Sequence, residues 1–236
     1  MFPDADRTVY RRRIEIVPGA TGATGEMEDH HHHFRVRIIH DGATVGDVEA
    51  TGVRAPWDTC ATGADAIRSM IGLTIGEAGD PRAWGADRSV HCTHVADLAL
   101  LTVRHALDVQ PLRYDVRIWP AARRHRVAVL EHNGSEVMRW ELDGPLIAGP
   151  SPWDGVALDR SVFLPWIRAG LDAVGVEQAM ILRRAATISI GNAYDLDDFA
   201  VAADVHAADE TCHTYRHEVA LTARRVVGAS RPLEWV

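Results

Sequence analysis

The densest group of residues that could do chemistry is the tetrapeptide His91-Cys92-Thr93-His94, which is followed by Asp97. The spacing of apolar residues predicts a helix over 94–107 with Thr93 as its cap, so these side chains gather at one helix start. Imidazoles and a thiolate there suit a zinc site of His91, Cys92 and His94. They equally suit acid–base catalysis, with His91 or His94 as the base and Asp97 orienting an imidazole. A structural interpretation stays open, in which the histidines are hydrogen-bonded core residues beside an inert cysteine.

A second group is the run His30–His33, which continues into an alternating segment that ends at His40. The alternation predicts a half-buried strand over 30–40, with His32 on the face of Phe34 and His31 on the other face. A histidine that faces an apolar core is usually structural, but it is also where a general base with a tuned pKa sits. His32 is therefore a candidate base. Metal ligation by this strand together with the tetrapeptide is an alternative.

Other candidates lie further apart in the sequence. Glu49 is a candidate catalytic carboxylate on the predicted return strand 44–53, although pairing with Arg35 or Arg37 is the simpler interpretation. Near the end of the chain, His213 and His217 are four residues apart, which suits a metal ion only if that segment is helical. The remaining candidate site residues are His31, Cys60, Cys212 and Tyr215.

The elements expected around these residues are short strands and helices. Asp41-Gly42 and Asn133-Gly134 are hairpin turn signals. The stretch 19–25, rich in Gly, Thr and Ala, is expected to be a flexible loop. Further strands are predicted over 13–17, 113–119, 125–130 and 137–142, and further helices over 63–72, 159–173 and 177–184. The predicted fold class is α+β, with antiparallel sheets and packed helices.

The two halves of the chain look alike. In each half an isolated strand is followed by a hairpin, a Pro-Trp-Asp step and a helix. We expect a single domain, 1–236, in which halves of about 8–110 and 111–236 are duplicated βββα units that share one core. The alternative is that short strands and the Pro-Trp-Asp step recur by chance.

Composition excludes several function classes. The chain has 25 basic residues, all of them arginine, against 33 acidic residues, for a net charge of −8. Without lysine it can form neither a pyridoxal phosphate anchor nor a P-loop nucleotide site. The negative balance argues against nucleic acid or an anionic membrane as partner, which leaves a small molecule.

Three cysteines and the lack of an apolar segment at the start of the sequence favour reduced thiols and a cytoplasmic protein. Hairpin strands at the edges of sheets make a homodimer a reasonable expectation.

Three segments resemble a known family. They are Ala55-Pro56-Trp57-Asp58-Thr59-Cys60, then Ile71-Gly72-Leu73-Thr74-Ile75-Gly76, then the tetrapeptide and its continuation Val95-Ala96-Asp97-Leu98. In this order they are similar to the domain of unknown function 2889 family (DUF2889), of which the Cys-Thr-His triplet is the most specific part. The stretches 182–185 and 211–215 also look similar. The resemblance implies no settled activity, only a setting in aromatic, terpenoid or acyl-CoA catabolism.

Taken together, these observations favour a small-molecule enzyme without a redox cofactor, of the lyase, hydratase or hydrolase type. It would work by acid–base chemistry or with a divalent metal such as zinc. The competing hypothesis is a non-catalytic protein that binds a small ligand or a subunit and whose histidines are structural.

Overall fold

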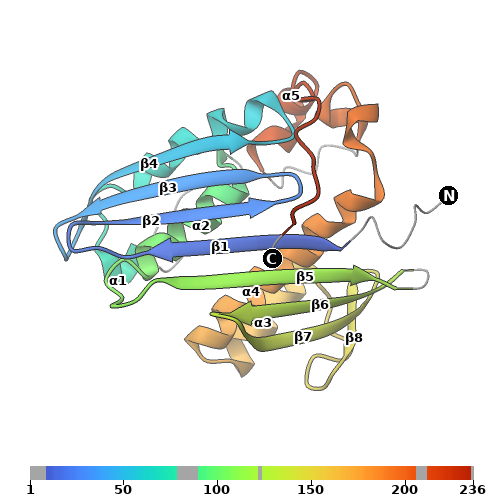
Figure 1. The fold of residues 1–236 in the computed structure, drawn as a ribbon, viewed down its shortest axis with the longest axis horizontal. Coiled ribbons are helices and arrows are strands. Elements are labelled where there is room, and N and C mark those ends of the chain that lie inside the picture. Colours follow the sequence, from blue (N-terminus) through green and yellow to red (C-terminus); the bar gives the residue numbers. More distant parts are fainter. Residues whose placement is uncertain (1–8, 79–89, 122–123, 206–211, 235–236) are drawn as a thin grey trace. The chain divides into compact units, whose positions relative to one another are not determined.

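The computed structural model describes residues 9–78, 90–121, 124–205 and 212–234. These residues form eight antiparallel strands with several packed helices, which confirms the predicted α+β class (Figure 1). The chain divides into two compact units. We call Arg13–Arg113 with Asp195–Arg231 the histidine unit, and Met1–Arg12, Tyr114–Tyr194 and Pro232–Val236 the tryptophan unit. The duplication of two sequence halves stays a prediction.

Four strands in the order β4-β3-β2-β1 make up the sheet of the histidine unit. They are β1 (Tyr10–Val17, within the unit from Arg13), β2 (Gly22–Asp29), β3 (His33–His40) and β4 (Val45–Arg54). Each of the pairs β2–β3 and β3–β4 is antiparallel. Phe34, Val36 and Ile38 point to the buried face, as the alternation predicts. Gly42 adopts a φ of 91° in the turn between β3 and β4, which glycine allows without steric cost.

Two sequence predictions near these strands are wrong. Residues 22–25 are not a flexible loop but the first half of β2, because β2 pairs with β3 from Gly22 to Glu28 and buries Ala23 and Met27. The strand predicted from residue 30 begins at His33 instead. Residues 30–32 form the connection between β2 and β3, and all three of their histidines are buried. Strand alternation therefore does not apply to them.

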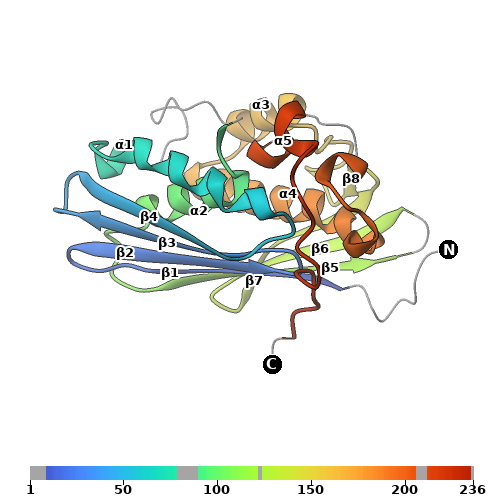
Figure 2. The ribbon, with the colours of Figure 1, turned by 90° about the horizontal axis from the view of Figure 1, so that it is seen from above.

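Helix α2 (Thr93–Arg104) packs on β2 and β3 (Figure 2). Val95, Leu98 and Val103 are among its buried residues. The close approach depends on Gly25 of β2, because a Cβ at that position would stand 2.1 Å from the hydroxyl oxygen of Thr102. The absent side chain thus sets the distance at which α2 lies over the strands.

The other helices of the histidine unit are short. The segment predicted as a helix over 63–72 is a 3-10 helix, Thr62–Met70, and it packs against β4. The remaining elements are α1 (Ile75–Ala78), α5 (His217–Ala220) and the 3-10 helices Asp58–Cys60, Leu196–Asp198, Ala202–Asp204 and His213–Tyr215. No helix in the described part of the chain combines the length and apolar character needed to cross a bilayer.

The tryptophan unit contains the strand order β5-β6-β7-β8 and two long helices. Asn133 and Gly134 have φ values of 49° and 84°, which gives the predicted hairpin turn between β6 and β7. Trp140 and Phe163 are fully buried in its core. The elements are β5 (Leu112–Pro120, which enters the unit at Tyr114), β6 (His125–His132), β7 (Ser135–Asp143), β8 (Leu146–Gly149), α3 (Arg160–Gly170), α4 (Ala173–Ile188) and the 3-10 helix Ser189–Ala193.

Candidate functional site

The connection between β2 and β3 is organised by one buried carboxylate. Asp29 is the last residue of β2, and its Oδ1 accepts hydrogen bonds from the backbone N–H groups of His31 and His32, both at 2.8 Å. The same oxygen lies 3.0 Å from Nδ1 of His32. An aspartate side chain that accepts backbone N–H groups two and three residues on is the usual way to close such a turn. Here the carboxylate also holds an imidazole.

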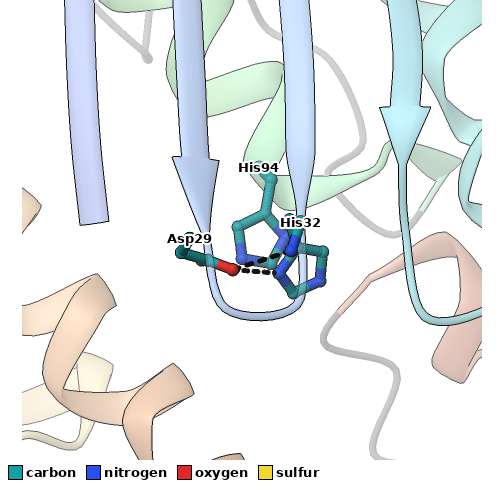
Figure 3. Close-up of side chains that lie close together, drawn as sticks. All are labelled: Asp29, His32 and His94. Atoms are coloured by element: carbon teal, nitrogen blue, oxygen red, sulfur yellow. Dashed lines mark hydrogen bonds and ion pairs between the residues drawn. The ribbon is translucent and has the colours of Figure 1, made fainter. Parts of the chain in front are cut away.

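The imidazole of His32 meets that of His94, which projects from the first turn of α2 (Figure 3). Their ring centroids are 3.9 Å apart and their planes differ by 28°, so the rings are stacked. Phe34 extends the stack, with its ring centroid 6.0 Å from that of His32. One donor atom from each of Asp29, His32 and His94 lies within 4.8 Å of the others, and all three residues are buried.

The hydrogen bond to Asp29 defines the tautomer of His32. Because a carboxylate oxygen only accepts hydrogen bonds, Nδ1 of His32 carries the proton and Nε2 carries the lone pair. The side chain of His32 is 9% exposed, whereas that of Asp29 is fully buried. The carboxylate of Asp29 therefore lies at the Nδ1 side of the imidazole, and the basic Nε2 is on the opposite side of the ring.

Arg54, the last residue of β4, anchors this connection from outside. Its Nη2 donates to the carbonyl oxygens of Asp29 at 2.6 Å and His32 at 3.3 Å, and it also contacts Glu28 Oε1 at 3.0 Å. Its Nη1 donates to the carbonyl oxygens of His30 and, in the C-terminal segment, Ala229. These bonds supplement the backbone hydrogen bond of 2.8 Å from the Asp29 N–H to the His32 carbonyl oxygen, so the carbonyl groups of the turn have partners.

The C-terminal segment 224–231 lies against the same connection. The Ser230 hydroxyl is 3.0 Å from Nδ1 of His31 and accepts a hydrogen bond from Arg225 at 2.9 Å. Arg225 also pairs with Asp197 at 2.8 Å. His31, a candidate from the sequence, is therefore tied to this segment, and its hydrogen bond to Ser230 is separate from the stack of His32 on His94.

The tetrapeptide divides between two places. The helix begins at Thr93, and its cap residue is Cys92 rather than the predicted Thr93. His94 joins Asp29 and His32, whereas Cys92 is buried. Burial raises the pKa of the Cys92 thiol, and the charges of Cys60 and Cys212 add to that rise. His91 is buried, and its carbonyl oxygen accepts a hydrogen bond from the backbone N–H of His213 at 3.0 Å.

The other sequence candidates are not among the described residues whose donor atoms converge at the stacked histidines. Glu49 is exposed on β4, where its Oε2 lies 3.6 Å from Nη1 of Arg37, in agreement with the pairing considered from the sequence. Asp97 is partly exposed in the second turn of α2. Tyr215 is partly buried at the end of the 3-10 helix His213–Tyr215.

Two residues of the site were missed from the sequence, Asp29 and Arg54. A signal for Asp29 existed, because an aspartate directly before a run of histidines at a strand end is a typical turn-forming residue. No comparable signal marks Arg54, which is one arginine among many and becomes distinctive only through its backbone acceptors.

Comparison with known proteins adds one relationship. Residues 15–107 match the model of the family DUF2889, described as a protein of unknown function. The resemblance is thereby confirmed over this range, and its extension to 182–185 and 211–215 stays a prediction. The DUF2889 region contains Asp29, His32, Cys60 and the tetrapeptide but ends before Cys212. No curated protein and no solved structure matches the chain.

Proposed function

We propose that this protein is an enzyme that moves protons on a small organic molecule, of the lyase, hydratase or hydrolase type, with His32 as its base. The observation that carries the proposal is the buried hydrogen bond of 3.0 Å between Asp29 Oδ1 and His32 Nδ1. A carboxylate in this position fixes the imidazole tautomer, leaves the lone pair on Nε2 and stabilises the imidazolium once a proton has been taken. Asp29 is then a positioning residue.

His94 supplies a second proton-transfer group. Its ring centroid is 3.9 Å from that of His32, so two positive charges on this pair would repel each other. The pair therefore suits a state in which one ring accepts a proton while the other donates one. In our proposal His32 removes a proton from carbon or from water. His94 protonates the leaving group or the oxygen on which charge develops.

Acid–base chemistry fits the observed rings better than a metal bound directly by both histidines. A coordinated zinc ion lies close to the plane of each imidazole, about 2.0 Å from the nitrogen. The ring planes of His32 and His94 differ by only 28° at a centroid distance of 3.9 Å. Such planes intersect much further from the ring nitrogens than a zinc–nitrogen bond reaches. Asp29 Oδ1 also already accepts three N–H groups. A zinc ion shared by Asp29, His32 and His94 would thus require the rings to rotate.

The substrate class and the location are expectations drawn from the sequence. The DUF2889 resemblance implies a setting in aromatic, terpenoid or acyl-CoA catabolism by analogy, and the matching family model is itself described as being of unknown function. A cytoplasmic location is supported by three cysteines, none of which forms a disulfide. A homodimer is a further expectation, drawn from the sequence alone.

The test detects proton abstraction without knowledge of the net reaction. The full chain is incubated in D₂O with a panel of acyl-CoA thioesters and aromatic and terpenoid acids, and deuterium uptake into each compound is followed by mass spectrometry. We expect exchange into one class, abolished by His32→Gln and slowed about 100-fold by Asp29→Asn. His125→Gln, which removes an exposed imidazole in the tryptophan unit, is the matched control.

Three outcomes would contradict the proposal. One is the absence of exchange in all compounds. Another is exchange that survives His32→Gln. The third is zinc-dependent activity in which His32→Gln also abolishes zinc binding, which would favour the metal-assisted alternative at the same residues. If instead a compound binds without exchange and binds His32→Gln equally well, the non-catalytic binding hypothesis is the better one.

A further inference from the structure

All three cysteines of the chain meet in one part of the histidine unit, although they lie far apart in the sequence. Cys60 ends a 3-10 helix, Cys92 precedes α2, and Cys212 precedes the 3-10 helix His213–Tyr215. Two backbone hydrogen bonds of 3.0 Å join these segments. One runs from the Cys92 N–H to the Gly63 carbonyl oxygen, and the other from the His213 N–H to the His91 carbonyl oxygen.

The side chains of these three segments also pack closely against one another. A Cβ built on Gly63 would stand 3.3 Å from the Cβ of Cys92 and 3.0 Å from the Cβ of His213, so glycine lets these two residues approach from opposite segments. The sulfur of Cys60 lies 3.5 Å from the hydroxyl oxygen of Thr214, the residue after His213. The packing therefore brings Cys60, Cys92 and His213 together around Gly63 and Thr214, and Cys212 is adjacent to His213 in the chain.

The two most buried thiols are protonated in the metal-free chain. Burial raises the pKa of Cys60 to about 11, and the charges of Cys212 and Asp58 add to that rise. Burial raises the pKa of Cys92 further, and Cys60 and Cys212 again add to it. A metal ion binds such thiols as thiolates, so its binding would release their protons. Burial, with the charge of Arg216, lowers the pKa of His213, which favours the neutral imidazole that can act as a ligand.

His213 has a nitrogen to offer. Its Nε2 lies 3.1 Å from the Thr62 hydroxyl oxygen, whereas its Nδ1 is buried and has no hydrogen-bond partner among the described residues. A buried imidazole nitrogen without a partner costs free energy, unless a ligand occupies it.

We infer that Cys60, Cys92, Cys212 and His213 form a zinc site with three sulfur donors and one nitrogen donor. This Cys₃His set is one of the usual tetrahedral donor sets for structural zinc. Within the described residues, only Asp29, His32 and His94 have donor atoms that already lie within 4.8 Å of one another. Zinc binding to the thiols therefore includes rotation of these side chains toward the metal, with release of the thiol protons.

This site is separate from the stacked histidines and goes beyond the proposed function. It accounts for Cys92, which the acid–base proposal leaves without a role, and it ties the segment at Cys212 to the DUF2889 region. By joining three segments, the metal would stabilise the start of α2, from which His94 projects.

The test is a titration of the reduced, metal-free full chain with Co²⁺, which takes zinc sites and reports sulfur ligation through a thiolate-to-metal charge-transfer band. We expect one equivalent to bind with this band and to be displaced by zinc. Cys212→Ser and His213→Ala, at the two less buried ligands, should each weaken Co²⁺ binding at least tenfold. Cys212→His should restore part of the affinity, because imidazole is itself a zinc ligand.

His32→Gln is the control variant, and it should leave the band unchanged. This keeps the result distinct from failure of the proposed function, which His32→Gln tests. The inference is overturned if no charge-transfer band forms, or if Cys212→Ser and His213→Ala bind Co²⁺ as tightly as the unaltered chain. It is also overturned if Co²⁺ binds without the band and His32→Gln abolishes that binding. Mass spectrometry that finds a disulfide among the three cysteines as the stable form would likewise overturn it.

Discussion

His32 and His94 stack with their ring centroids 3.9 Å apart, one from the connection between β2 and β3 and the other from the first turn of α2. The carboxylate of Asp29 positions the ring of His32 through a hydrogen bond of 3.0 Å between Oδ1 and Nδ1. The stack thus joins the two histidine groups of the sequence at a single buried carboxylate. Four predictions about this arrangement and its surroundings can be tested without a known substrate.

Asp29→Ala should destabilise the protein by about 3 kcal/mol, because it removes the acceptor of three N–H groups in a buried turn. Asp29→Asn keeps one acceptor oxygen and should cost less. Urea denaturation followed by tryptophan fluorescence measures both. Glu49→Ala, at an exposed carboxylate on β4, is the control and should change the free energy of unfolding by less than about 0.5 kcal/mol. Equal effects of Asp29→Ala and Glu49→Ala would contradict the role given to Asp29.

Gly25→Ala should destabilise the protein by about 2 kcal/mol, since the added Cβ would overlap Thr102 and press on Leu98 of α2. It should also move His94 away from His32, a change visible in the imidazole resonances of an NMR spectrum. Gly46→Ala in β4 provides the matched control, because its new Cβ would meet nothing nearer than 3.6 Å. If both variants unfold at the same temperature, α2 does not depend on the close approach at Gly25.

The stability of the chain should fall with decreasing pH partly through His213. Burial lowers the pKa of this imidazole in the folded state, so the unfolded chain binds the proton more readily. The contribution is present above the ordinary histidine pKa of 6.5 and is lost as the pH falls from there toward the lowered value. His213→Gln should therefore show a smaller loss of stability between about pH 7.5 and about pH 5.5.

Denaturant unfolding of metal-free protein at several pH values measures this slope. His217→Gln removes an exposed imidazole from the same segment and serves as the control. A slope that is the same in the unaltered chain and in His213→Gln would show that His213 is as easily protonated in the folded state as in the unfolded one.

The three cysteines should differ in reactivity when the chain is reduced and metal-free. With a pKa of about 11, Cys60 carries a thiolate in roughly one molecule in ten thousand at pH 7, and the pKa of Cys92 is raised further. Cys212 is only partly buried. Short treatment with iodoacetamide, followed by peptide mapping, should thus label Cys212 first and the other two only after unfolding. Rapid labelling of Cys60 in the folded chain would contradict the buried position.

Zinc added before the alkylating agent should protect Cys212 as well. This outcome connects the reactivity of the thiols to the metal site proposed above. Magnesium ions, which prefer oxygen ligands, are the control and should leave the labelling of Cys212 unchanged.

Much of the local structure could be predicted from the sequence because it depends on neighbours along the chain. Alternating residues indicated β3, and apolar spacing indicated α2. The Asn133-Gly134 pair indicated the hairpin turn between β6 and β7. The tetrapeptide at the start of α2 was singled out, and a meeting of His32 with His94 was considered only in the alternative of a shared metal ion. Composition also excluded lysine-dependent chemistry, which no tertiary contact can restore.

The partners of these residues were decided only by the tertiary structure. The alternating pattern predicted residues 30–32 as part of β3. They form a turn instead, because the carboxylate of Asp29 accepts hydrogen bonds from the backbone N–H groups of His31 and His32. Cys92 and His94 are neighbours in the sequence but belong to different groups, because a helix start directs successive side chains to different sides. Which group each one joins follows from the packing of α2 on Gly25 and from the backbone bonds that bring His213 to His91.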